Sequence, residues 1–305
     1  MNYQPLIDAV SQFEGCHITE QAPMSAATTF KVGGPADLLI DLPNAAATMV
    51  AVRACRENDI PYLFIGKGSN LVVGDKGFRG AVLRLDGRNA EPWVIEEDDV
   101  IYAHAGISLR RLCLFARDNG LTGLEFAYGI PGTVGGAVYM NAGAYDGEMA
   151  NVVESVDCVS DDGELVTILP DELRMDYRHT ALMEWDYVVT GAFFQLKKGD
   201  KDEIWAKMQD FMARRHDKQP LEYPSAGSFF KRPVGHFAGK LIQDAGLKGF
   251  TVGGAQVSEK HAGFVINRGG ATAEDLVILC HKVQEKVYDE FGVRLEPEVR
   301  FVGEF

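Results

Sequence analysis

The sequence predicts an α+β protein in which short strands fill the first two thirds of the chain and helices dominate the last third. Strand-like apolar runs follow one another up to about residue 200, and long amphipathic segments come after it. Separate runs of strands and helices are typical of α+β folds. A chain of 305 residues is long enough for two or three domains. We therefore place a boundary near residue 200 and a weaker one near residue 80, which gives segments 1–80, 81–200 and 201–305.

The first two segments are expected to combine two helices with many short strands. Asn44 is a good N-cap for a helix over 44–58, and Ser108 is a good N-cap for a second helix that Gly120 closes. The second helix repeats Leu109, Leu112, Cys113 and Ala116 at helical spacing. Short apolar runs predict strands at PYLFIG, LVV, AVLRL, WVIEE, DVIYAHAG, VVESVDCVS, ELVTIL and DYVVTGAFFQL.

The last segment is expected to be mostly helical. An amphipathic pattern over 200–218 places Ile204, Met208 and Phe211 on one face. A shorter helix over 236–246 ends at Gly246, and the strongest helix pattern runs from the N-cap Thr272 to the stop signal Gly292. The stretch LEPEVRFVGEF, residues 295–305, is expected to be a final strand.

Composition excludes several classes of protein. A net charge of −14 disfavours non-specific nucleic-acid binding, which depends on Lys and Arg. No run approaches the ~18 apolar residues of a membrane span, and MNYQPLIDAVSQFEG is no secretory signal. The five cysteines are scattered singly, which indicates reduced, packed thiols and no zinc site or disulfide frame. We expect a cytoplasmic protein without a metal, a membrane contact or an obligate protein partner.

Two glycine turns, GKGSN at 66–70 and GIPGTVGGA at 129–137, are candidates for a phosphate site. Neither supplies the GxxxxGK[ST] of a P-loop. GKGSNL also lacks the third glycine of a Rossmann fingerprint and leads into more strand. Successive backbone N–H groups in such turns can bind an anion without cationic side chains. An ordinary tight turn is an equally open interpretation of either one alone, whereas two together favour a dinucleotide.

The positive charge gathers in one part of the sequence. The range from Arg214 to Lys240 contains six basic residues and only two acidic ones, Asp217 and Glu222. A local basic patch on an acidic protein suits a small anionic ligand. The alternative is a solvated helix end followed by a loop, and charge alone does not decide between them.

Six motifs in a fixed order carry a resemblance over nearly the whole chain. They are TFKVGGPAD (29–37), IGKGSNLVV (65–73), GIPGTVGGAVYMNAGAY (129–145), YRHT (177–180), SAGSFFKRP (225–233) and LEPEVR (295–300). In this order the sequence resembles the UDP-N-acetylenolpyruvoylglucosamine reductase (MurB) family. KRP in place of KNP, followed by GHFAGKLIQDAGLKG, is similar to the type II branch, which lacks a tyrosine-bearing loop of type I.

The resemblance implies an FAD-binding domain of the vanillyl-alcohol-oxidase (PCMH) type in two lobes, 1–80 and 81–200. A C-terminal α+β substrate-binding domain would follow at 201–305. NADPH would reduce the flavin, and the enolpyruvyl group of UDP-N-acetylglucosamine enolpyruvate would then be reduced to give UDP-N-acetylmuramate for peptidoglycan synthesis. Neither glycine turn contains His or Cys, so the FAD is expected to be non-covalent.

The resemblance also implies the site residues. Ser228 matches the proton donor, Arg178 the arginine near the enolate or carboxylate, and Glu298 the active-site glutamate; Thr180 replaces a usual serine. Alternative interpretations are a turn serine, a surface arginine, and an exposed ion pair between Glu298 and Arg300, which alternation places on one face of the last strand. Substrate contacts fall on Tyr177, Arg214, Lys218 and Lys231. Cofactor contacts fall on Gly66, Lys67, Gly68, Ser69, Asn70, Gly129, Ile130, Pro131, Gly132, Thr133, Val134, Gly135, Gly136 and Asn141.

Two other functions stay open at this point. Another FAD-linked oxidoreductase on the same scaffold, such as an alcohol oxidase, would be reoxidised rapidly by oxygen. A nucleotide-sugar-binding protein without catalysis would keep the glycine turns but not the catalytic residues. The presence of Ser228, Arg178 and Glu298 together favours the reductase.

Overall fold

The computed structural model describes residues 1–95 and 98–305. The chain forms two compact units, each built from segments that are separate in the sequence, and we describe each unit by itself. The first unit contains 1–19, 38–67 and 80–214, and the second contains 20–37, 68–79 and 215–305. The division into lobes 1–80 and 81–200 and a domain 201–305 stays a prediction. The last two residues of the predicted strand WVIEE lie outside the described residues.

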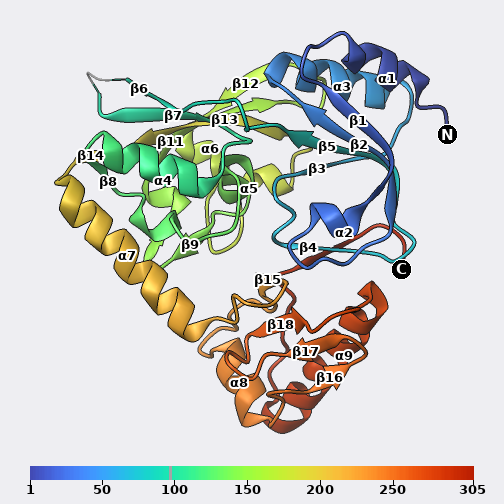
Figure 1. Ribbon diagram of the computed structural model, residues 1–305, viewed down its shortest axis with the longest axis vertical. Coiled ribbons are helices and arrows are strands. Elements are labelled where there is room, and N and C mark those ends of the chain that lie inside the picture. Colours follow the sequence, from blue (N-terminus) through green and yellow to red (C-terminus); the bar gives the residue numbers. More distant parts are fainter. Residues whose placement is uncertain (96–97) are drawn as a thin grey trace. The chain divides into compact units, whose positions relative to one another are not determined.

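An antiparallel five-stranded sheet forms the centre of the first unit (Figure 1). Its long strand β13 is buried along most of its length because it lies inside the sheet and its residues are mainly apolar. The strand order is β12 (Leu165–Ile168), β11 (Val153–Val159), β13 (Val188–Gln195), β7 (Val100–His104) and β6 (Trp93–Ile95). The predicted strands of this region are confirmed within their described residues.

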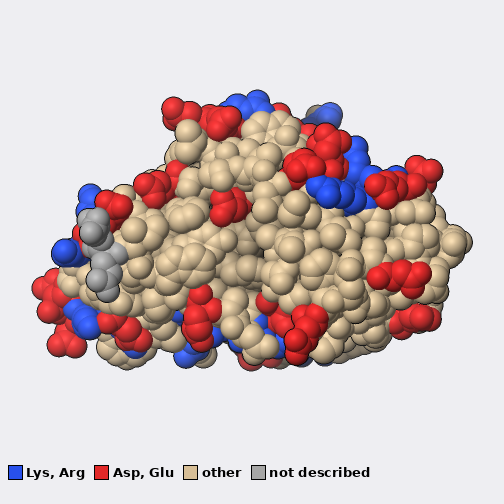
Figure 2. All heavy atoms as spheres, turned by 90° about the horizontal axis from the view of Figure 1, so that it is seen from above, with Lys and Arg blue, Asp and Glu red and all other residues tan. Residues whose placement is uncertain are grey.

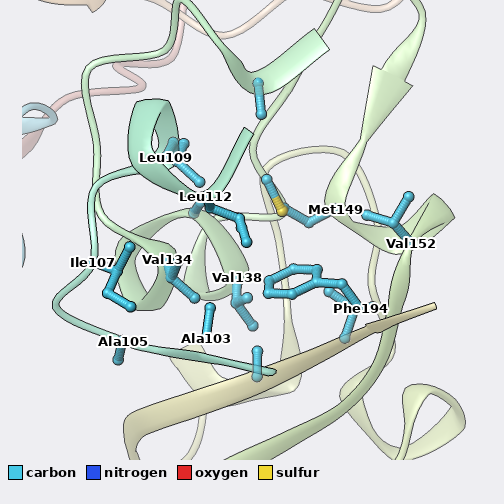
Figure 3. Close-up of a cluster of buried hydrophobic side chains, with 14 of the residues drawn as sticks. Ala103, Ala105, Ile107, Leu109, Leu112, Val134, Val138, Met149, Val152 and Phe194 are labelled. Carbon is cyan, nitrogen blue, oxygen red and sulfur yellow. The ribbon is translucent and has the colours of Figure 1, made fainter. Parts of the chain in front are cut away.

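Two helices pack on this sheet and support the glycine-rich stretch (Figure 3). Helix α4 (Leu109–Asp118) begins at Ser108, whose side chain accepts a hydrogen bond from the Arg111 N–H. Helix α5 (Val134–Tyr139) follows the second glycine turn directly. Figure 3 shows their apolar side chains gathered with those of β7 and β13 in one buried cluster, including Leu109, Leu112, Val134, Val138, Ala103 and Phe194.

The first unit has further helices at its start and its end. Helix α3 (Ala45–Glu57) begins at Asn44, whose side chain accepts a bond from the Ala47 N–H, as predicted. It packs with α1 (Gln4–Ser11) over a second apolar cluster. Helix α7 (Lys201–Lys218), whose residues up to Arg214 belong to this unit, confirms the amphipathic helix expected at 200–218. The shorter elements of the chain are α2 (Met24–Ala27), α6 (Pro170–Leu173), η1 (Glu125–Ala127), η2 (Met149–Asn151), η3 (Ala181–Met183), β8 (Leu121–Thr122), β9 (Gly143–Ala144), β10 (Gly147–Glu148) and β14 (Lys197–Lys198).

A four-stranded sheet uses strands from the first part of the chain. Its order is β1 (His17–Pro23), β2 (Pro35–Leu42), β5 (Phe78–Leu85) and β3 (Tyr62–Ile65), and β3 and β5 are parallel. Alternate residues of β2 are buried, which is the pattern of a strand with one face on a core. The first glycine turn begins where β3 ends.

The second unit contains an antiparallel four-stranded sheet, the helices α8 and α9, and the short helix α2. The strand order is β15 (Ser225–Ser228), β18 (Phe264–Asn267), β17 (Ala255–Val257) and β16 (Thr251–Val252). Helix α8 (Ala238–Asp244) and helix α9 (Ala273–Phe291) match the two predicted helices. Thr272 caps α9 and Gly292 ends it with φ +67°, both as expected.

The final strand is much shorter than predicted. Within 295–305 the strand is limited to β19 (Arg300–Val302), whose partner is β4 (Leu71–Val73) in parallel register, while Pro297 and Glu304 form isolated bridges. Pro297 has no N–H to give to a ladder, and Gly303 leaves the extended conformation with φ +81°. The expectation of one strand over the whole stretch was therefore wrong.

Burial and charge complete the description. Cys55, Cys113, Cys158 and Cys280 are buried, as predicted for packed thiols, and Cys16 is half-buried. Burial raises the pKa of Cys55 to about 12 and keeps this thiol protonated at neutral pH. Within 1–95 and 98–305, no helix is both long and apolar enough to cross a bilayer. On the face in Figure 2, acidic side chains occur widely and basic ones lie among them in small groups.

Candidate active site

The two glycine turns meet in the first unit. Gly66 follows β3, and Thr133 lies in the second turn immediately before α5. A Cβ atom on Gly66 would lie 2.4 Å from Oγ1 of Thr133, closer than any real contact. A side chain at Gly66 would therefore separate the turns, which explains the glycine and confirms that backbone comes very close to its neighbour here.

The second turn is held by the backbone of a neighbouring segment. Val134 N–H donates to the Ile107 carbonyl at 2.8 Å, and Gly135 N–H donates to the Ala105 carbonyl at 2.9 Å. A Cβ on Gly135 would lie 2.8 Å from Cβ of Ala105. The segment 105–107 thus supports the turn, although the sequence reasoning used it only as the end of a strand. The small residues in HAG, residues 104–106, follow an apolar strand directly and could have indicated this close backbone contact.

The remainder of the first turn belongs to the second unit, where an unpredicted segment supports it. Gly68 has φ +59°, and a Cβ there would lie 2.4 Å from the Ala27 carbonyl oxygen. The Thr29 N–H donates to the Gly68 carbonyl at 3.2 Å. The motif TFKVGGPAD begins at Thr29, so the family pattern contained the signal without assigning it a contact.

These contacts fit a bound dinucleotide. Glycine is required at Gly66 and Gly135 by close backbone approach, and at Gly68 by its left-handed conformation as well. The N–H groups of Val134, Gly135 and Gly136 donate within the protein, so they fix the shape of the turn in which an anionic diphosphate would be held. The residues around both turns are therefore suited to hold FAD.

Arg178 lies at the tip of a two-residue turn in the first unit. Asp176 and His179 exchange backbone hydrogen bonds of 3.0 Å, and Arg178 has φ +53°. Its guanidinium donates to the carbonyl oxygens of Gly143 at 3.0 Å and Asn141 at 3.4 Å. The motif YRHT is thereby tied to the end of the glycine-rich stretch, and the arginine head is held in one place.

Asn141 also ties the glycine-rich stretch to the turn that carries Arg178. Its side chain is fully buried, donates to the Asp176 carbonyl at 3.0 Å and accepts from the Ala150 N–H at 2.9 Å. The Thr180 hydroxyl, also fully buried, donates to the Tyr139 carbonyl at 2.8 Å. Threonine in place of the family's usual serine thus keeps a hydroxyl that fixes the turn of Arg178. Contact of Asn141 with the cofactor stays a prediction.

Two predicted substrate residues of the first unit are exposed and have partners there. Tyr177 is 45% exposed, and the Arg178 guanidinium lies 5.1 Å from the centre of its ring. Arg214 forms an ion pair of 2.7 Å with Asp210 one turn earlier on α7. A substrate phosphate at Arg214 would compete with that carboxylate.

In the second unit a β-bulge directs Ser228. β15 pairs with β18 through Ser225–Ile266 and Ser228–Phe264, and the register shifts between these two pairs. Gly227, inside the shift, has φ +75°. A bulge re-aims the side chain that follows it, and here Ser228 is exposed while its neighbour Phe229 is buried.

Glu298 lies beside the strand that carries Ser228. The Glu298 N–H donates to the Phe229 carbonyl at 2.9 Å, and Lys231 N–H donates to the Glu296 carbonyl at 2.8 Å. The Lys231 ammonium lies 3.6 Å from the Glu296 carboxylate. The structure therefore brings together Ser228, Glu298 and Lys231, three predicted site residues from distant motifs. Lys218 is exposed at the end of α7.

The predicted residues thus form two groups, one in each unit. Arg178, Tyr177 and Asn141 share a turn with the glycine-rich stretch in the first unit. Ser228, Glu298 and Lys231 share neighbouring segments in the second unit, together with Asn70. The individual roles of these residues stay predictions.

Comparison with known proteins decides the family. A UDP-N-acetylenolpyruvoylglucosamine reductase of Clostridium botulinum (strain Alaska E43 / Type E3) is 47% identical over 304 residues, 99% of this chain and 98% of the relative. The enzyme of the same description from Agathobacter rectalis is 47% identical, with both chains covered completely. The chain belongs to the UDP-N-acetylenolpyruvoylglucosamine reductase family.

Other comparisons support this assignment and confirm the fold class. The family model "FAD binding domain" matches residues 37–169, which include both glycine turns. The model "UDP-N-acetylenolpyruvoylglucosamine reductase, C-terminal domain" matches residues 219–302, which include Ser228 and Glu298. The crystal structure of the MurB reductase from Thermus caldophilus has a TM-score of 0.79 at 35% identity and covers 95% of this chain and 99% of its own. This UDP-N-acetylenolpyruvoylglucosamine reductase family member is therefore an FAD-dependent oxidoreductase.

Substitution of Gly66 tests the meeting of the turns. Gly66→Ala is expected to weaken FAD binding by about 10-fold to 100-fold, since overpacking costs about 1–3 kcal/mol. The cause is the clash of the new methyl group with Thr133 Oγ1. Fluorescence titration of the apoprotein with FAD measures the effect. The double variant Gly66→Ala with Thr133→Ala lacks the clashing atom, so it should bind FAD more tightly than the summed losses of the two single variants predict. Unchanged FAD affinity in Gly66→Ala contradicts the contact.

Proposed function

We propose that the chain catalyses its family's reaction with NADPH as hydride donor and with Ser228, Glu298 and Arg178 as its reacting side chains. It is an FAD-dependent UDP-N-acetylmuramate dehydrogenase that reduces UDP-N-acetylglucosamine enolpyruvate in peptidoglycan biosynthesis. When bound, FAD supplies the redox chemistry, taking up a hydride and releasing it to the enolpyruvyl double bond. The observation that carries the proposal is the hydrogen bond of 2.9 Å from the Glu298 N–H to the carbonyl of Phe229, next to Ser228.

Ser228 has the role of proton donor. Addition of a hydride to one alkene carbon leaves negative charge on the other, beside a carboxylate, and a proton must then reach that carbon. A positioned proton donor accelerates such a step by about 10²–10⁴-fold. Ser228 suits the role because its side chain is exposed on a strand fixed at both edges, by Gly263 on one side and Glu298 on the other.

Arg178 and Glu298 stabilise the charge that forms. Arg178 holds its guanidinium against the carbonyls of Asn141 and Gly143 and so needs little reorganisation to meet an enolate or carboxylate. Glu298 supplies a carboxyl group on a segment hydrogen-bonded to the Ser228 strand, from which it can accept or return a proton. Both therefore act on charge and proton rather than on hydride.

The anionic substrate calls for cationic partners. We assign Tyr177, Arg214, Lys218 and Lys231 to binding of the UDP-sugar, with the basic side chains on its diphosphate. Lys231 is held next to the Ser228 strand by its backbone bond to Glu296, and its ammonium, 3.6 Å from the Glu296 carboxylate, would exchange that partner for a substrate phosphate. A cytoplasmic location without an obligate protein partner is part of the proposal, supported by five free cysteines, the form that a reducing compartment maintains.

The visible spectrum of the purified protein, with identification of the released cofactor, tests the proposal first. Flavin bands and free FAD are expected, followed by NADPH oxidation that depends on the enolpyruvyl UDP-sugar. UDP-N-acetylglucosamine, which lacks the double bond, is the matched control and should give no turnover. Rapid reoxidation by oxygen with no response to the enolpyruvyl sugar would instead identify an oxidase, and reduction without turnover would identify a binding protein.

A further inference from the structure

The side chain of Asn70 contacts the segment that carries Glu298. Its Nδ2 donates to the Glu298 carbonyl oxygen at 3.0 Å. The backbone of Asn70 takes part as well, because its carbonyl accepts from the Arg300 N–H at 2.9 Å. Asn70, the last residue of the first glycine turn, thus binds the backbone of both Glu298 and Arg300. We infer that Asn70 is a positioning residue that fixes Glu298 for proton transfer; this inference rests on the role proposed for Glu298.

Glu298 precedes β19, so the ladder of that strand does not hold its backbone in place. The parallel ladder between β4 and β19 begins with the pair Leu71–Arg300. One step earlier, the side-chain amide of Asn70 donates to the Glu298 carbonyl and so extends the contact between the two segments. On the other side, the Glu298 N–H is bound to the Phe229 carbonyl. Both peptide groups around Glu298 are thereby held by hydrogen bonds.

The preceding residue adds to the effect. The ring of Pro297 fixes its φ angle near −65° and keeps the backbone of the preceding residue out of the helical conformation. Phe230 and Pro297 also form an isolated bridge. Without the Asn70 amide, the Glu298 carbonyl would lose this hydrogen bond, and the peptide between Glu298 and Val299 would be held less firmly. A misplacement of about 1 Å can cost about 10²-fold in rate.

The inference gives Asn70 a role different from cofactor contact alone. The resemblance places Asn70 among the FAD-binding residues, and a pure flavin contact would affect every step that uses the flavin. A positioning role for Glu298 affects only the half-reaction that needs a proton. The two half-reactions therefore separate the roles.

Asn70→Leu tests the inference because leucine keeps the size and removes the amide donor. We expect reoxidation of the reduced flavin by the enolpyruvyl UDP-sugar to slow by about 10-fold to 100-fold. Flavin reduction by NADPH, measured with saturating FAD, should slow far less than reoxidation because it does not use the Glu298 proton. Stopped-flow absorbance of the holoenzyme measures both half-reactions. Equal losses in the two would assign Asn70 to the flavin and overturn the inference.

A matched control exists on the same segment. The Gln284 side chain donates to the Leu295 carbonyl at 2.8 Å, three residues before Glu298. Gln284→Met removes a comparable bond and should leave both half-reactions near the wild-type rates. In the double variant, Asn70→Leu with Glu298→Gln should react no more slowly than Glu298→Gln alone, because coupled residues are not additive. Additive losses would contradict action through Glu298.

A measurement without substrate separates this inference from the proposed function. Asn70→Leu should speed hydrogen exchange of the Glu298 amide, whereas Gln284→Met should not. If wild-type reduced flavin is not reoxidised by the enolpyruvyl sugar, the proposed function fails, and amide exchange still tests the contact. If the wild type turns over and Asn70→Leu matches it in rate and exchange, only the inference fails.

Discussion

Ser228→Ala is expected to slow reoxidation of the reduced flavin by the enolpyruvyl UDP-sugar by about 10²–10⁴-fold, the usual contribution of a positioned proton donor. Reduction of the flavin by NADPH should proceed at nearly the wild-type rate because no proton from Ser228 is needed. The Ser228 side chain is exposed, so its loss should leave the fold intact. Anaerobic stopped-flow absorbance follows the two half-reactions separately.

Ser225→Ala is the matched control for this substitution. Ser225 begins the same strand, and its backbone carbonyl, which accepts from the Thr29 hydroxyl at 2.7 Å, is unchanged by the substitution. This variant should keep both rates. A Ser228→Ala enzyme that loses both half-reactions equally would show a damaged flavin site and remove the proton-donor role.

Glu298→Gln should have the second large effect, a loss of about 10²–10³-fold in kcat. Glutamine keeps the shape of the side chain and both backbone bonds of residue 298, to Phe229 and from Asn70. Only the negative charge and the ability to give or take an acidic proton disappear. Steady-state NADPH oxidation with saturating enolpyruvyl sugar gives kcat, and the melting temperature should match that of the wild type.

Glu296→Gln separates this effect from a general loss of negative charge. The Glu296 side chain is 75% exposed and pairs with Lys231 across 3.6 Å. An exposed ion pair contributes about 0–1 kcal/mol, so kcat should change by less than about fivefold. Similar losses in the two variants would assign the effect to the electrostatics of the segment rather than to Glu298.

Local signals explain why most helix ends were predictable. Each of three helices begins at a residue whose side chain accepts a hydrogen bond from the backbone N–H three residues later. These residues are Asn44, Ser108 and Thr272, and the signal for each is therefore local in sequence. Gly292 ends α9 for an equally local reason, because glycine adopts a positive φ without strain. The strand after α9 was not predictable in this way. Its partner β4 is distant in sequence, so alternation alone could not show where pairing begins.

The site was predictable in its residue types but not in its connections. Serine, arginine and glutamate in the family motifs indicated proton transfer and charge stabilisation. The bulge at Gly227 and the bond from Asn70 to Glu298 depend on which segments become neighbours, and no periodicity encodes that. The same holds for the approach of Gly66 to Thr133, where the glycine was visible and its neighbour was not.

The pairing of β4 with β19 also has a consequence for how the protein is made. The strand that follows the first glycine turn leaves the ribosome early, whereas its partner, Arg300–Val302, is synthesised only after the helices of the second unit. Contacts between residues so far apart in sequence form late. The strand after the first glycine turn therefore lacks its partner until residues 300–302 have emerged. We expect FAD to bind stably only to the completed chain.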